Sequence, residues 1–231
     1  MYKTELHCHT SEVSNCSRLT AEQLVRRYAD AGYTTVVLTN HLSRFTYSNH
    51  RFDHSFWSWN DKISYFMEGY HIFENAAKGK LHPILGCELR SNIDENEYLL
   101  YGVTEELLRS IPNMMNAPID AVREAMHSIG GLFYQAHPFR NAMCVISPDQ
   151  IDGMEVFNAC TEDFRNLTAS HWADHFGLHR SSGSDVHRNE HVISGGIETD
   201  SPITSREELV AALLSPSLTL LGNPKEPDPK G

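Results

Sequence analysis

The sequence predicts an α/β fold in which parallel strands form a barrel and helices connect them. One observation is the order of the chain, where about seven strand-like runs alternate with helical patterns. The other is a set of metal-binding side chains placed at the ends of separate apolar runs: His7, His9, His41, Glu88, His137, Asp185 and His187. Scattered ligands can meet only if the fold gathers strand ends, which a barrel does at its C-terminal face.

The strands are expected where apolar and β-branched residues cluster between turn residues. Their ranges are 3–8, 34–39, 81–88, 97–103, 132–136, 153–158 and 179–184. The helices are expected where polar capping residues precede amphipathic runs. Their ranges are 21–31, 61–77, 118–129, 162–177 and 206–214. Capping boxes at Thr20–Gln23 and Ser205–Glu208 fix the first and last helix starts.

Residues 1–222 are expected to form one domain, because no repeat or linker interrupts them. An insertion at about 43–60 is expected to lie near the site. Its aromatic residues would either shape a pocket or pack the insertion onto the barrel: Phe45, Tyr47, Phe52, Phe56, Trp57 and Trp59. The tail 223–231 is rich in proline and charge, so we expect it to be disordered.

Composition excludes several classes of protein. The chain has 231 residues, and its net charge of −11 argues against broad binding of nucleic acid or of anionic membranes. It has no apolar run of the roughly 20 residues that a membrane span needs. The five cysteines show no pairing pattern and the N-terminal segment shows no signal-peptide pattern, so we expect a cytoplasmic protein with reduced thiols. The oligomeric state is not readable from the sequence.

The candidate ligands are imidazole nitrogens and carboxylate oxygens, which suits Zn, Mn or Fe at a catalytic site. Side chains alternate along a strand, so His7 and His9 share a face whereas Cys8 points away. Neither H-x-H nor the D-x-H pair of Asp185 and His187 is specific alone. The prediction of a metal site rests instead on the joint pattern, in which five predicted strands each end in a potential ligand. Glu88 can bridge two cations, because a carboxylate offers one oxygen to each.

Two further polar residues follow predicted strands. Arg140 comes shortly after His137, and its planar guanidinium suits a pair of phosphate oxygens, although a surface ion pair is the alternative. Asn158 ends a strand and would either hydrogen-bond a ligand or substrate or close a turn. Arg140 and Asn158 are therefore the candidate substrate-binding residues.

These residues resemble the PHP family, which is named for its presence in polymerases and histidinol phosphatase. The resemblance covers about residues 3–190. It rests on six motifs: HCHT at 7–10, TNH at 39–41, GCE at 86–88, AHPFR at 136–140, EVFN at 155–158 and GSDVH at 183–187. The long segment between the second and third strands is similar to the histidinol-phosphatase-like branch.

The resemblance implies a distorted seven-stranded, TIM-like (β/α) barrel with two or three divalent metal ions at its C-terminal strand ends. By matching motifs, the first metal would be held by His7, His9, Glu88 and Asp185. Glu88 and His137 would contribute to a second metal. His41 and His187 would contribute to a third, and either is a candidate proton donor where it is not metal-bound.

The chain departs from the family pattern at three positions. Asn40 precedes His41 where family members often have Asp. Asn15 stands where a further His often follows the H-x-H motif, and Tyr98 stands where a His commonly opens the fourth strand. Asn15 and Tyr98 can supply oxygen, so we keep both as weak candidate ligands.

The leading functional prediction is a metal-dependent phosphoesterase that hydrolyses a small phosphomonoester, histidinol-phosphate-like or nucleotide-like, through metal-activated hydroxide. No stable nucleic-acid or membrane partner is expected. One alternative is another metal-dependent hydrolase of the deacylase type. The absence of a lysine at the strand ends counts against a carbamate-bridged version of it. A second alternative is a non-catalytic module that binds metal or phosphate without turnover.

Overall fold

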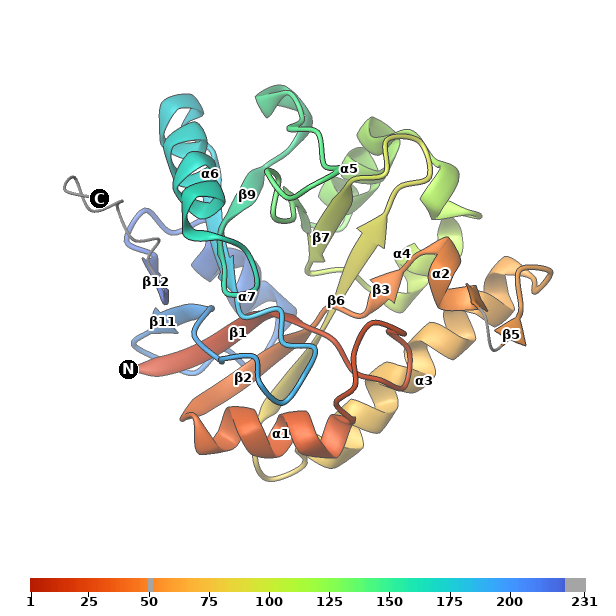
Figure 1. The fold of residues 1–231 in the computed structure, drawn as a ribbon, viewed down its shortest axis with the longest axis horizontal. Coiled ribbons are helices and arrows are strands. Elements are labelled where there is room, and N and C mark those ends of the chain that lie inside the picture. Colours follow the sequence, from red (N-terminus) through yellow and green to blue (C-terminus); the bar gives the residue numbers. More distant parts are fainter. Residues whose placement is uncertain (50–51, 223–231) are drawn as a thin grey trace.

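A mixed sheet curves into a nearly closed barrel at the centre of the fold (Figure 1). The computed structural model describes residues 1–49 and 52–222. The strands of the main sheet are β1 (Tyr2–Cys8), β2 (Tyr33–Leu38), β3 (His41–Leu42), β6 (His82–Arg90), β7 (Glu97–Tyr101), β8 (Leu132–Gln135), β9 (Gly153–Asn158), β10 (His179–Gly183), β11 (Ile197–Thr199) and β12 (Thr219–Leu220). A separate hairpin consists of β4 (Ser48–Asn49) and β5 (Phe52–Asp53).

Neighbouring strands follow the order β10-β9-β8-β7-β6-β2-β1-β11-β12, and β3 also pairs with β6. The barrel nearly closes because β1 and the segment after β10 meet at a parallel bridge between Cys8 and Val186. Within the described residues this sheet has ten strands. The seven expected strands overlap seven of them, and the short strands β3, β11 and β12 are additional. The expectation of a seven-stranded barrel is therefore corrected.

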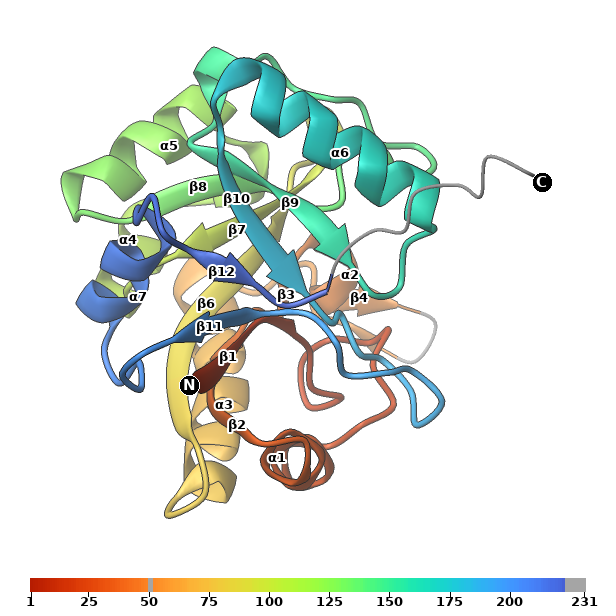
Figure 2. The same cartoon turned by 90° about the vertical axis from the view of Figure 1, so that its left-hand side faces the viewer.

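Helices surround the strands on the outside of the barrel, as Figures 1 and 2 show. The helices are α1 (Ala21–Asp30), α2 (Arg44–Tyr47), α3 (Trp59–Ala77), α4 (Glu105–Ser110), α5 (Ile119–Ser128), α6 (Asp163–Phe176) and α7 (Arg206–Leu213). Short 3₁₀ turns lie at Met114–Asn116 and Pro148–Gln150. None of the helices within the described ranges is long and apolar enough to cross a membrane.

Local sequence signals explain where the first and last helices begin. Thr20 accepts a hydrogen bond from the Gln23 amide and the Gln23 side chain accepts from the Thr20 amide, so the predicted capping box is present. Ser205 caps α7 in the same way through the Glu208 amide. The Glu208 carboxylate instead accepts from the amide of Thr204, which lies one residue before the cap.

Strand β7 runs against its two neighbours in the sheet. It is antiparallel to both β6 and β8, whereas the pairs β1–β2, β2–β6, β8–β9 and β9–β10 are parallel. The connection from β6 to β7 is too short for the crossover that a parallel pair requires. Consequently Arg90, the last residue of β6, lies opposite Glu97, the first residue of β7. The start of β7 therefore lies at the end of the barrel where β6 and β8 finish.

The insertion expected at 43–60 contains α2, the β4–β5 hairpin and the first turn of α3. Its aromatic side chains divide between the two expected roles. Phe45 is half exposed and lines a cavity, whereas Tyr47 is buried in the core. Trp59 donates a hydrogen bond to the Leu108 carbonyl and so packs the insertion against α4. The expectations for the Phe52 side chain and for the tail 223–231 lie outside the described residues.

Candidate metal centre

Seven predicted ligand side chains come together at one end of the barrel, with Glu88 at their centre. Glu88 Oε1 lies 3.2 Å from His7 Nε2 and 3.1 Å from His137 Nε2. Glu88 Oε2 lies 3.3 Å from His9 Nε2 and 2.8 Å from His41 Nδ1. The two oxygens of this carboxylate thus face two different pairs of imidazoles, which is the arrangement expected of a ligand that bridges two metal ions.

Asp185 occupies the opposite side of the cluster. Its Oδ1 lies 3.2 Å from His9 Nε2, 3.5 Å from His7 Nε2 and 3.4 Å from His187 Nδ1. The backbone of Asp185 has a φ of 51°, and that of His137 has a φ of 25°. Such conformations are uncommon for residues with a side chain and persist where the surrounding structure enforces them. In Asp185 the amide is fixed by a 3.0 Å hydrogen bond to the His7 carbonyl.

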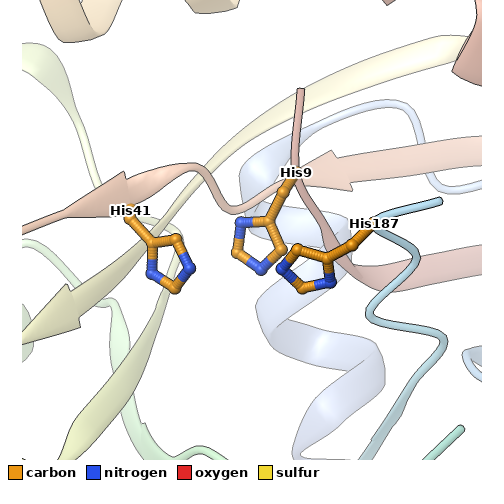
Figure 3. Close-up of side chains that lie close together, drawn as sticks. All are labelled: His9, His41 and His187. Atoms are coloured by element: carbon orange, nitrogen blue, oxygen red, sulfur yellow. The ribbon is translucent and has the colours of Figure 1, made fainter. Parts of the chain in front are cut away.

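Three imidazoles form one face of the cluster, as Figure 3 shows. The His9 and His41 rings are stacked with centroids 4.4 Å apart, and the His9 and His187 centroids are 4.9 Å apart. His9 is fully buried, and neither of its ring nitrogens has a hydrogen-bond partner. His9 therefore presents ring nitrogens without a hydrogen-bond partner to the centre of the cluster.

The residues present fit divalent cations. Within the described residues, groups of three ligand atoms lie within 4.8 Å of one another: His9, His41 and His187; His7, His9 and Asp185; His7, Glu88 and His137; and His41, Glu88 and Glu97. Several buried atoms lie close to one another and yet form no hydrogen bond, including His7 Nε2, His41 Nδ1 and Glu88 Oε2. Buried polar atoms normally find partners, so their clustering indicates that they serve a bound ion.

The electrostatics of the cluster also favour a cation. Burial tends to raise the pKa of Glu88, but the imidazoles of His41 and His7 outweigh it and hold that pKa well below the usual range. Burial and the neighbouring His41 lower the pKa of His9 to about 3. Burial tends to lower the pKa of His7, but Asp185 and other carboxylates raise it well above its ordinary value. The cluster therefore combines ionised carboxylates with a negative potential, both of which promote metal binding.

Glu97 is a candidate ligand that the sequence analysis missed. Its Oε2 lies 3.5 Å from His137 Nε2, and its Oε1 lies 3.8 Å from His41 Nδ1 and accepts a hydrogen bond from Arg90. The search for ligands at the ends of strands overlooked Glu97 because it begins a strand. The signal that could have found it is the short connection after Arg90, which predicts an antiparallel pair.

Tyr98 does not take the place of a ligand. Its ring is buried and stacks on Phe133 with centroids 4.6 Å apart, and its hydroxyl donates to Asp94 at 2.6 Å. Successive side chains of a strand point to opposite faces, so Glu97 faces the barrel interior where Tyr98 does not. The structure therefore does not support the weak prediction that Tyr98 is a metal ligand, and the neighbouring residue Glu97 lies in the cluster instead.

Asn15 and Asn40 also have structural partners. Asn15 lines the cavity, and its Nδ2 donates a 2.7 Å hydrogen bond to the Phe45 carbonyl, which holds the amide against the insertion. Asn40 is buried, and its Oδ1 accepts hydrogen bonds from the Thr10 amide and the Ser14 hydroxyl. These bonds fix the loop after β1. The structure therefore does not support Asn15 as a ligand.

Glu155 is a second residue that sequence reasoning missed. It is fully buried in β9, and its Oε1 lies 2.8 Å from His7 Nδ1. Its Oε2 accepts hydrogen bonds from the His137 amide and from Asn158 Nδ2, both at 3.0 Å. A carboxylate on Nδ1 favours the tautomer whose Nε2 is free to bind a metal. Gly183 permits this contact, because a Cβ there would lie 2.5 Å from Glu155 Oε1.

The two predicted substrate-binding residues have different environments. Arg140 is partly exposed at the wall of the cavity, and its Nη2 donates to Asp185, Asn158 and Thr161 at 2.9–3.1 Å. Asn158 is fully buried and donates to Asp185 Oδ2 at 3.1 Å. Arg140 is therefore accessible from the cavity, whereas Asn158 holds the carboxylate of Asp185 in place. This buried position does not support the prediction that Asn158 binds substrate.

A cavity of about 450 Å³ opens onto the cluster. Its floor includes Glu88, His137 and Asp185, and Arg140 and Phe45 are among its walls. This volume is within the range of small-molecule sites.

Residues 5–191 match the PHP domain family. The chain belongs to that family. The match spans the segment that contains every residue of the cluster, from His7 to His187. No curated protein matches the chain.

Solved structures share the fold of this PHP domain at low sequence identity. PsfC from Pseudomonas syringae PB-5123 is 14% identical with a TM-score of 0.67, over 96% of this chain and 91% of that chain. A two-domain protein from Bacteroides vulgatus, described as containing a predicted PHP-like metal-dependent phosphoesterase, is 17% identical with a TM-score of 0.57, over 90% and 62%. The lesion-specific endonuclease PfuEndoQ from Pyrococcus furiosus is 16% identical with a TM-score of 0.57, over 95% and 57%.

Proposed function

We propose that this PHP domain is a metal-dependent phosphoesterase that hydrolyses a small phosphomonoester. The main support for the proposal is that residues of the buried ligand cluster and Arg140 line one cavity of about 450 Å³. A cationic guanidinium beside a metal centre suits a phosphoryl group, because phosphate oxygens can bind to both.

The ligands divide into three neighbouring positions. The first position has His7, His9 and Asp185, with Glu88 beside them. The second has Glu88, His137 and Glu97, and the third has His41 and His187. We propose that two or three divalent ions, such as Zn, Mn or Fe, occupy these positions. The mixture of nitrogen and oxygen donors suits each of these metals.

When bound, the metal ions would supply a nucleophilic hydroxide at neutral pH and would neutralise charge on the phosphoryl oxygens. The protein would position the substrate around that chemistry. Within the described residues, all side-chain hydrogen bonds of Arg140 to protein use Nη2. Its remaining donors would bind a non-bridging oxygen. His187 would donate the proton to the leaving oxygen from Nε2, because its Nδ1 lies 2.7 Å from the Asp185 carbonyl oxygen. His41 is the alternative donor.

A small substrate is favoured over a polynucleotide by two observations. The cavity is of small-molecule size, and the chain has a net charge of −11, which disfavours a long polyanion. We keep the histidinol-phosphatase-like branch as part of this proposal. We also propose a reducing, cytoplasmic setting, since all five cysteines are free.

The test is phosphate release from a panel of phosphomonoesters and phosphodiesters with added Mn, Zn or Fe, against a chelated control. We expect metal-dependent release from a monoester and its loss in His9→Ala, while the variant stays folded. His71→Ala is the matched control, because His71 is an exposed histidine on α3. Release only from diesters or oligonucleotides would contradict the substrate class. Acyl substrates cleaved without phosphate release would favour the deacylase alternative, and ligand binding without turnover would favour a binding module.

A further inference from the structure

Strand β1 is irregular at the point where it presents its first candidate ligand. Glu5 pairs with Val36 of β2, and Cys8 pairs with Leu38. Between these two pairs β1 advances by three residues while β2 advances by two, so β1 contains one extra residue, as in a β-bulge. Such a bulge interrupts the ladder of hydrogen bonds and re-aims a side chain. Here it lies in the segment that contains His7.

The side chain of Glu5 supplies an acceptor for the backbone of this irregular segment. Its Oε1 accepts hydrogen bonds from the amide of Leu6 at 3.0 Å and from the amide of His7 at 2.9 Å. Glu5 is fully buried, and buried amides require a hydrogen-bond partner. Glu5 therefore stabilises the backbone conformation from which the His7 imidazole reaches the cluster.

The same oxygen of Glu5 also joins β1 to the segment that follows β10. It accepts a third hydrogen bond, at 2.8 Å, from the amide of Ser184, which is the residue before Asp185. The two segments lie very close together, because a Cβ on Gly183 would collide with the Cβ of His7. One side-chain atom thus contacts the backbone on both sides of the line where the barrel closes.

We infer that Glu5 is a positioning residue for the first metal position, and that it acts through the reach of Oε1 to the amides on both sides. The ligands of this position come from the two segments that Glu5 joins. Asp185 Oδ1 lies 3.5 Å from His7 Nε2 and 3.2 Å from His9 Nε2, and a shift between the segments would change both distances. The inference rests on the metal centre of the proposed function but not on any particular substrate.

Two substitutions of Glu5 separate the reach of the acceptor from the presence of an acid group. Glu5→Gln keeps an oxygen at the place of Oε1, and its NH₂ takes the place of Oε2, which forms no hydrogen bond within the described residues. Glu5→Asp keeps the acid group but is one methylene shorter, so it cannot reach all three amides. We expect Glu5→Gln to bind Zn(II) nearly as tightly as wild type. We expect Glu5→Asp to bind it about 10- to 100-fold more weakly, the usual loss when a group that orients a metal ligand is removed.

Competition with a chromogenic chelator measures the zinc affinity, and near-ultraviolet circular dichroism establishes that each variant is folded. Leu108→Ala is the control for a general loss of stability. Leu108 is fully buried on α4, which contributes no residue to the candidate metal-binding groups of the described chain, so this variant should unfold more easily in urea and keep its zinc affinity.

The comparison between the two Glu5 variants decides the inference. Equal zinc affinity in Glu5→Gln and Glu5→Asp, or weaker binding by Glu5→Gln, would overturn it, because the reach of the acceptor would then not matter. If Glu5→Asp does not fold, Glu5→Gln decides alone, and a loss of zinc affinity of about 10-fold or more would overturn the inference. A wild-type protein that binds no zinc would overturn the proposed metal centre as well, whereas zinc binding without phosphate release would contradict only the proposed substrate chemistry.

Discussion

Replacing Glu155 by glutamine should weaken metal binding without removing a ligand. In the structure Glu155 accepts from three donors, which are His7 Nδ1, the His137 amide and Asn158 Nδ2. A glutamine keeps one acceptor oxygen and adds an NH₂ group that must face at least one of these donors. If it faces His7, the imidazole must place its proton on Nε2, the nitrogen that would otherwise bind the metal.

The magnitude follows from the buried geometry. Glu155 is 1% exposed, so water cannot replace the lost acceptor. A buried donor without a partner costs about 1–3 kcal/mol. Loss of the outer partner of a metal-binding histidine typically lowers metal affinity by about 10- to 100-fold, which is about 1.4–2.8 kcal/mol. We therefore expect Glu155→Gln to bind its metals about 10- to 100-fold more weakly than wild type.

Competition with a chromogenic chelator measures this change directly. Glu124→Gln is the matched control, because Glu124 is exposed on α5, and it should bind metal as wild type does. Near-ultraviolet circular dichroism establishes that each variant is folded. A folded Glu155→Gln variant with wild-type metal affinity would refute the argument that Glu155 sets the His7 tautomer.

Other substitutions test the remaining parts of the structure. Glu97→Gln should lower the measured metal content or affinity at the second position. Glu95→Gln should not, because the side chain of Glu95 bonds to Arg44 and Arg90 in the described structure and belongs to none of the candidate metal-binding groups found there. Equal metal content in both variants would count against Glu97 as a ligand. Arg140→Ala should lower kcat/KM for phosphate release by about 10- to 150-fold at saturating metal, since a hydrogen bond to a charged group contributes about 1.5–3 kcal/mol. An unchanged kcat/KM would show that Arg140 does not bind the substrate. Phe133→Ala should lower the free energy of unfolding in urea by about 3–5 kcal/mol, because Phe133 is fully buried against Tyr98. A decrease of less than about 1 kcal/mol would contradict that packing.

The sequence by itself located the longer strands and helices of this fold and most of the side chains that meet in the cluster. Strand and helix patterns are local, so the capping box at Thr20 and the first strand, which ends at Cys8, could be located without the structure. Ligand types are also readable where a strand stops, and the convergence of Glu88, His137 and Asp185 followed from their positions after parallel strands. These predictions succeeded because each depends on short-range spacing along the chain.

The tertiary structure alone decided which side chains complete the centre. Glu97 faces the cluster because β7 is antiparallel, and strand direction is set by pairing between distant segments. Glu155 lies within a strand, and only the curvature of the folded sheet, in which β9 lies between β8 and β10, brings its carboxylate to His7 of β1. Such choices depend on the direction of each side chain in the folded barrel, which residue types and spacing do not contain.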